Sequence, residues 1–207
     1  MTKSLVRHLY EELEKGNTKR ALYIVDLLGN NINKLYKGKS LLCWAKNFDN
    51  QEVIKKLEDN NIKIDTAHLN EDSFMDIAKI TSKPIFCSHT AFYGVQPNDR
   101  NLKDYQLKMI IDSGGIVGLC LVSDFLNGTN KCDIQNIVSH IDYFACKFGI
   151  NNLALGTDFY GTNHLPKGVS TYSNLISKLS NALKNIGYTE KSINKIFFEN
   201  ANYFMIS

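Results

Sequence analysis

The feature that most limits the fold is an alternation of short apolar runs with amphipathic helical segments, which begins near residue 61. The apolar runs predict strands at 62–67, 83–88, 116–122 and 153–158. Because the runs are apolar at successive positions, they are typical of parallel strands that are buried on both faces. A helical segment follows each run, and several of these segments end at a glycine. We therefore predict an α/β fold: a partial (β/α) TIM-barrel-like parallel sheet of about four strands, with a small open doubly wound sheet as the alternative.

The first 60 residues have a different pattern, in which apolar residues recur at helical spacing. Residues 38–65, GKSLLCWAKNFDNQEVIKKLEDNNIKID, resemble an ankyrin repeat. The alternative is a plain helical hairpin, because two repeats alone bury too small a core. The sequence thus predicts a helical, ankyrin-repeat-like segment over residues 1–60 and a (β/α) domain over residues 61–207.

Composition argues against several classes of partner. The chain has 207 residues and a net charge of only +3, with its lysines spread along the sequence, so we expect no nucleic-acid binding. No apolar stretch is long enough to span a bilayer, and the charged N-terminus has no signal-peptide core, so we expect no membrane partner. The five cysteines form no CxxC pair, which favours a reducing, cytoplasmic location.

Three apolar runs end on residues that bind metals. The segment IDTAH ends at His68, CSHT contains His89, and LALGTDFYG contains Asp158. Residues that follow parallel strands converge on one end of the sheet even when they are far apart in sequence. Two imidazoles and a carboxylate placed in this way predict part of a metal-hydrolase site.

The region from about residue 61 to residue 206 resembles the C-terminal half of the membrane dipeptidase (renal dipeptidase) family of zinc peptidases. The resemblance rests on segments in a fixed order: IDTAH, KPIFCSHTA, DRNLKD, SGGIVGL, HIDYFACKFGINNLALGTDFYG and GYTEKSINKIFFENANYF. It implies a (β/α)₈ barrel with a two-zinc site that hydrolyses dipeptides. Residues 61–207 would then be a truncated dipeptidase-like (β/α) domain.

The resemblance also implies roles for single residues. His68 and His89 would be ligands of one zinc ion, since imidazole suits Zn²⁺. Asp158 would bind the other metal and hold or deprotonate the attacking water. Arg100, in the segment DRN, would bind the carboxylate of a dipeptide or a similar small amide through its guanidinium fork.

Other polar residues are expected to have structural roles. We expect Asn101 and Asp104 to cap the helix that follows them, and His140 to stabilise the fold. Without the family pattern, His68 and His89 would more often be hydrogen-bonded fold residues, and Asp158 could organise its own turn. Tyr160 stands where the family usually has a second Asp.

Upstream of the matched region there is no His-x-Asp and no strand-end Glu of the kind that completes the family's zinc site. Three readings therefore stay open: a zinc dipeptidase, a non-catalytic relative (a pseudoenzyme) that acts as a binding or scaffolding module, and another amidohydrolase-type barrel. A half-barrel also has unpaired strand edges, so we expect a homo-oligomer as a hypothesis.

Overall fold

The computed structural model describes residues 2–28, 36–59 and 63–206. The chain divides into two compact units, Met1–Lys63 and Ile64–Ser207. The predicted boundary between residues 60 and 61 lies outside the described residues.

The first unit is helical, as its apolar spacing predicts. Its helices are α1 (Thr2–Glu14), α2 (Thr18–Leu28), α3 (Leu41–Asn47) and α4 (Gln51–Asp59). The apolar faces of these helices supply the core, with Leu9 and Leu57 fully buried. The Asn50 side chain, directly before α4, is bonded to the start of α2, because its Nδ2 donates to Thr18 Oγ1 at 2.9 Å.

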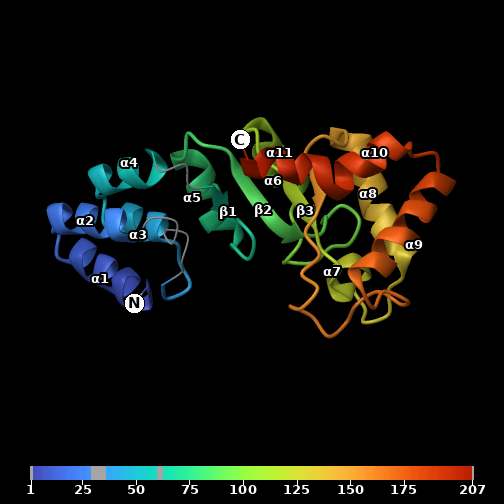
Figure 1. Cartoon of the computed structure of the whole chain (residues 1–207), viewed down its shortest axis with the longest axis horizontal. Helices are drawn as coiled ribbons and strands as arrows, with labels where there is room; N and C mark the ends of the chain where they lie inside the picture. Colours follow the sequence, from blue (N-terminus) through green and yellow to red (C-terminus); the bar gives the residue numbers. More distant parts are fainter. Residues whose placement is uncertain (1, 29–35, 60–62, 207) are drawn as a thin grey trace. The chain divides into compact units, whose positions relative to one another are not determined.

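The second unit is built on a four-stranded parallel sheet, as predicted (Figure 1). Its strands are β1 (Ile64–Asp65), β2 (Ile85–Thr90), β3 (Val117–Leu119) and β4 (Leu153–Leu155), paired in the order β1-β2-β3-β4. Because all strands run in the same direction, their C-terminal ends lie at one edge of the sheet. The register of β2 against β3 shifts between Cys87 and Thr90, the interval that contains Ser88 and His89.

Helices connect and cover these strands. They are α5 (Glu71–Ile80), α6 (Asp104–Asp112), α7 (Ser123–Asn127), α8 (Ile134–Phe148) and α9 (Tyr172–Asn185). Side-chain caps explain several starts: the carboxylate of Asp133 accepts from the backbone N–H of Gln135 at the start of α8. The five-residue helix α7 is not predicted from the sequence.

Two glycines allow the sheet to curl tightly. A Cβ atom at Gly118, on β3, or at Gly156, directly after β4, would overlap the carbonyl oxygen of Ser88 on β2. Both positions therefore exclude a side chain, because the obstacle is backbone.

The chain ends in a helical segment that packs on the sheet: α10 (Glu190–Asn194), the π-helical turn η2 (Lys195–Glu199) and α11 (Asn200–Ile206). Phe204 of α11 is buried against Phe86, and Ile116 and Ala154 belong to the same apolar cluster. Asn200 Nδ2 donates to the carbonyl oxygen of Leu153 at 2.8 Å, which fixes the segment to β4.

Within residues 2–28, 36–59 and 63–206, none of the helices has the length and apolar character needed to cross a bilayer.

Candidate metal centre

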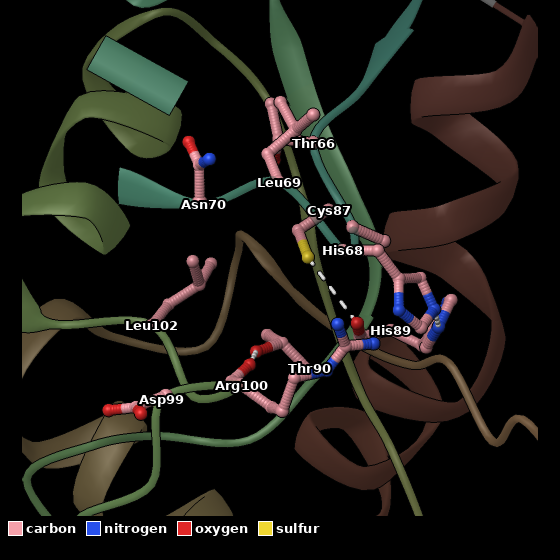
Figure 2. Close-up of a pocket in the computed structure, with 11 residues that line it drawn as sticks. Thr66, His68, Leu69, Asn70, Cys87, His89, Thr90, Asp99, Arg100 and Leu102 are labelled. Atoms are coloured by element: carbon pink, nitrogen blue, oxygen red, sulfur yellow. Dashed lines mark hydrogen bonds between the residues drawn. The ribbon is translucent and has the colours of Figure 1, made fainter. Parts of the chain in front are cut away.

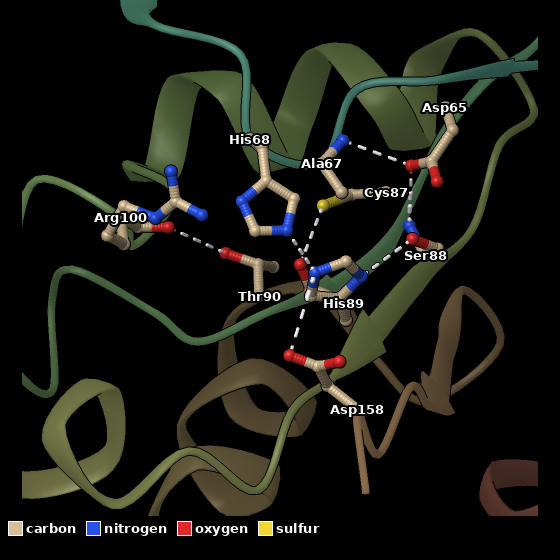
Figure 3. A network of polar contacts seen from close by, with 9 residues as sticks. All are labelled: Asp65, Ala67, His68, Cys87, Ser88, His89, Thr90, Arg100 and Asp158. Atoms are coloured by element: carbon tan, nitrogen blue, oxygen red, sulfur yellow. Dashed lines mark hydrogen bonds and ion pairs between the residues drawn. The ribbon is translucent and has the colours of Figure 1, made fainter. Parts of the chain in front are cut away.

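His68 and His89 meet at the C-terminal end of the sheet. His68 lies in the loop after β1, His89 lies near the end of β2, and their Nε2 atoms are 2.6 Å apart (Figure 3). His68 has a φ of 66°, a left-handed conformation that non-glycine residues seldom adopt and that clusters at functional sites. The backbone at His68 therefore has an uncommon conformation.

Asp158 reaches the same point from β4. Its Oδ2 lies 3.9 Å from His89 Nε2, and its φ of 49° is also left-handed. Gly161 leaves room for this carboxylate, because a Cβ at Gly161 would overlap the carboxylate oxygens of Asp158. About a quarter of the Asp158 side chain, 26%, is exposed, so the group is open to solvent and ligand.

Arg100 lies in the loop between β2 and α6, and its guanidinium is directed toward the two histidines (Figures 2 and 3). Its backbone is held at both sides: Asn98 Oδ1 accepts from the Arg100 N–H at 2.9 Å, and Thr90 Oγ1 donates to its carbonyl oxygen. The guanidinium carbon also lies 5.8 Å from the ring centre of Phe125. A positioned guanidinium beside an imidazole pair is suited to holding an anion.

His68, His89 and Arg100 line one pocket of about 200 Å³ (Figure 2). It is lined by Thr66, Ala67, His68, Leu69, Asn70, Cys87, His89, Thr90, Asp99, Arg100 and Leu102. The structure therefore brings together His68, His89 and Arg100 in the pocket, with Asp158 in reach of His89. Burial raises the pKa of the Cys87 thiol, so this residue presents a neutral S–H and not a thiolate.

Two polar residues around the histidines were not singled out in the sequence. The carboxylate of Asp65, at the end of β1, accepts from the backbone N–H of Ala67 at 3.0 Å and of Ser88 at 2.9 Å. The Ser88 hydroxyl lies 2.8 Å from His89 Nδ1. The available signal was position alone: Asp65 and Ser88 lie beside the candidate metal ligands His68 and His89 at strand ends.

Asn101 and Asp104 have structural roles that differ from the helix capping predicted for them. The prediction that Asn101 and Asp104 cap the next helix is wrong, because the N-terminal cap position of α6 is Lys103. Asn101 is buried and donates to the carbonyl of Phe125, which holds the Arg100 loop, and Asp104 accepts from Tyr143. These contacts are long-range, so helix spacing could not reveal them.

His140 belongs to a His-x-Asp sequence, but its surroundings are structural. The ring is fully buried on α8, accepts from the Phe92 N–H at Nδ1 and contacts the Leu126 carbonyl through Nε2. Both nitrogens therefore have backbone partners, which leaves none for a metal. Tyr160 is fully exposed and brings no second carboxylate near Asp158.

The comparison with protein families decides the relationship. The sequence model of the family described as membrane dipeptidase, peptidase family M19, matches residues 50–204. This chain belongs to the membrane dipeptidase family. The match begins ahead of the predicted boundary at residue 61, and the comparisons bring no support for ankyrin repeats in the first 60 residues.

Two known proteins are similar to this chain in sequence. A dipeptidase of Aspergillus oryzae is 28% identical over 134 residues, which cover 62% of this chain and 32% of the relative. An uncharacterized protein of Klebsiella pneumoniae is 31% identical over 181 residues, covering 86% and 66%.

A solved structure extends the likeness to three dimensions. The crystal structure of a metallopeptidase from Rhodobacter sphaeroides, liganded with a phosphinate mimic of the dipeptide L-Ala-D-Ala, is 29% identical with a TM-score of 0.69. The match covers 75% of this chain and 45% of that chain. The dipeptidase fold is thus shared, and this chain spans about half the length of such solved relatives.

Members of the membrane dipeptidase family are zinc metallopeptidases, and the donor atoms here fit part of such a site. Two imidazole nitrogens face one point, and one carboxylate stands close by, which is ligand chemistry that suits zinc. Among the described residues, however, no group of three or more His, Cys, Asp or Glu side chains is arranged to hold a metal ion. The histidine pair therefore fits as two ligands of one ion, and a complete site would need further ligands.

Proposed function

We propose that this chain carries the imidazole pair and the substrate-binding arginine of a metal-dependent dipeptidase site. The observation that carries the proposal is the meeting of the His68 and His89 Nε2 atoms, 2.6 Å apart, in a pocket that also holds Arg100. The guanidinium of Arg100 beside the pair supports the proposal, and the family relationship supplies the reaction class.

Each residue has a role that follows from its chemistry. His68 and His89 would hold zinc, which when bound polarises a carbonyl and acidifies water. Hydrolysis adds water across the peptide C–N bond, so a base has to accept a proton and the departing amine has to gain one. Asp158 would be the group for that transfer, and its position 3.9 Å from His89 Nε2 supports this role. Arg100 would bind the free carboxylate of a dipeptide through paired N–H donors.

Metal content and dipeptide hydrolysis test this proposal together. The full chain would be titrated with zinc by calorimetry and assayed on Ala-Ala, beside His89→Ala and a control, His8→Ala, which removes an exposed histidine of α1. We expect zinc binding that is lost in His89→Ala and kept in His8→Ala. Zinc binding that is equal in all three proteins would contradict the assignment of His89.

A second candidate function is a non-catalytic relative that acts as a binding or scaffolding module. The absence of a three-ligand group in the described part of the chain favours it, because catalytic zinc sites use three protein ligands. It predicts that dipeptide binding at Arg100 survives without hydrolysis. Calorimetry with Ala-Ala, beside a hydrolysis assay in the presence of zinc, separates it from the first proposal.

A second copy of the chain could pair with the open edges of the sheet. Among the described strands, β1 and β4 each pair on one side only, so the sheet has two open edges that another chain could extend. We propose a homo-oligomer on this basis. Light scattering that gives a clean monomer mass across a range of protein concentrations would rule it out.

A further inference from the structure

A single carboxylate connects the two backbone segments that carry the histidine pair. Oδ1 of Asp65 accepts from the N–H of Ala67, the residue before His68, and from the N–H of Ser88, the residue before His89 (Figure 3). The two distances are 3.0 and 2.9 Å. Both histidines therefore lie one residue from an amide that the same oxygen atom holds.

The position of Asp65 in the sheet explains this arrangement. The pairing of β1 with β2 ends at Asp65 and Phe86, and the Thr66 N–H still donates to the carbonyl of Phe86. Beyond that point β1 turns away into the His68 loop. The next amide of β2 that faces this side, at Ser88, therefore has no strand carbonyl of β1 beside it. The side chain of Asp65 takes the place of a strand carbonyl and so joins the start of the loop to β2.

Ser88 carries the connection on to the imidazole. Its hydroxyl lies 2.8 Å from His89 Nδ1, and His89 Nε2 lies 2.6 Å from His68 Nε2. If Nδ1–H donates to the hydroxyl, Nε2 of His89 keeps its lone pair on the side of His68, as a metal ligand needs. The contacts thus close a ring from Asp65 through Ser88, His89 and His68 back to Ala67.

We infer that Asp65 is the positioning residue of this site: its carboxylate fixes the His68 and His89 segments so that their Nε2 atoms meet, while Ser88 selects the tautomer of His89. The carboxylate acts through the backbone amides of Ala67 and Ser88. The inference rests on the proposed function only where it concerns zinc, because the contact of the two rings and the hydrogen bonds of Asp65 are made between protein atoms.

The first test uses the metal-free full chain. An NOE between the imidazole protons of His68 and His89 reports their contact, and the ¹⁵N shifts of the His89 ring report its tautomer. We expect the NOE in the wild type and in Asp65→Asn, which keeps an acceptor oxygen, and its loss in Asp65→Ala. The matched control is Asp133→Ala, which also removes a carboxylate that accepts a backbone N–H, at the start of α8.

The second measurement is zinc affinity of the same variants by calorimetry. Loss of a residue that orients a ligand typically weakens metal binding about 10- to 100-fold, and we expect this for Asp65→Ala but not for Asp65→Asn or Asp133→Ala. If Asp65→Ala does not fold, Ser88→Ala replaces it. That variant should lose the Nδ1–H tautomer of His89, and Ser88→Thr, which keeps a hydroxyl, should restore it.

The outcomes distinguish the positioning role of Asp65 from the proposed metal-dependent function. An NOE that persists in Asp65→Ala, or that is missing from the wild type, overturns the inference. Equal loss in Asp65→Ala and Asp133→Ala also overturns it, because the effect would then be general destabilisation. An NOE that depends on Asp65 in a chain that binds no zinc upholds the positioning role and contradicts the proposed function.

Discussion

Asp158 lies 3.9 Å from His89, although β4, which precedes Asp158, and β2, which contains His89, are not neighbours in the sheet. β3 separates the two strands, and the approach is made over its end. The sheet is curled enough there for the backbone of Ser88 to lie against Gly118 and Gly156. The candidate metal centre is therefore a product of sheet curvature as well as of strand order.

The space beside Asp158 can be tested with Gly161→Ala. Its new Cβ would overlap the Asp158 carboxylate, so we expect this side chain to move away from His89 while the fold is kept. Activity on dipeptides should fall, and the melting temperature should change little. Unchanged activity would show that the placement of Asp158 does not matter for the reaction.

Arg100 should matter for substrates with a free carboxylate. Hydrogen bonds to a charged group contribute about 1.5–3 kcal/mol, so Arg100→Ala should weaken dipeptide binding about 10- to 100-fold. Arg100→Lys keeps the charge but loses the fork and should recover only part of the affinity. Calorimetry with Ala-Ala and with its C-terminal amide checks the prediction, since the amide should bind wild type and Arg100→Ala alike.

The close approach of β2 to β4 should make Gly156 intolerant of a side chain. In Gly156→Ala the Cβ would overlap the Ser88 carbonyl, and overpacking of this kind costs about 1–3 kcal/mol. We expect a lower free energy of unfolding in urea. Gly149→Ala is the comparison for glycine replacement without overlap: a Cβ there meets no atom within 4 Å, although its positive φ adds some strain. A smaller effect at Gly156 than at Gly149 would contradict this packing.

His140 should make the fold sensitive to acid. Burial lowers its pKa to about 4, from an ordinary value near 6.5 in the unfolded chain. Between these two values the unfolded state binds a proton that the folded state does not, so stability falls as the pH drops from 6.5 to 4. The loss should be about 3 kcal/mol at most, and it should level off below pH 4. Urea unfolding across this pH range should show a shallower slope in His140→Gln.

The sequence allowed the four parallel strands, the helical first segment and the convergence of His68 and His89 to be predicted. Buried parallel strands have a continuous apolar signal, and strand ends meet by geometry, so both follow from local patterns. The helix α7 was missed because five residues are too few for a periodic signal. The caps expected at Asn101 and Asp104 were wrong because both side chains bind groups far away in the sequence.

The parts of the site that were not predicted depend on backbone conformation. No residue pattern indicates that His68 and Asp158 adopt a left-handed conformation, because that shape is imposed by contacts made elsewhere. Asp65 was overlooked for a similar reason. A carboxylate that replaces a strand carbonyl can be recognised only once the length of β1 is known.

The π-helical turn sets the rotational phase of the end of the chain. In η2 the Asn200 N–H bonds the carbonyl of Lys195, five residues back, so this turn contains one residue more than an α-helical turn. Removal of one residue from η2 would leave an ordinary α-helical turn, so Phe204 would keep its direction toward the sheet. A single-codon deletion in this turn would therefore preserve the packing of Phe204 on Phe86 and Ala154, which lie more than a hundred residues and about fifty residues earlier in the chain.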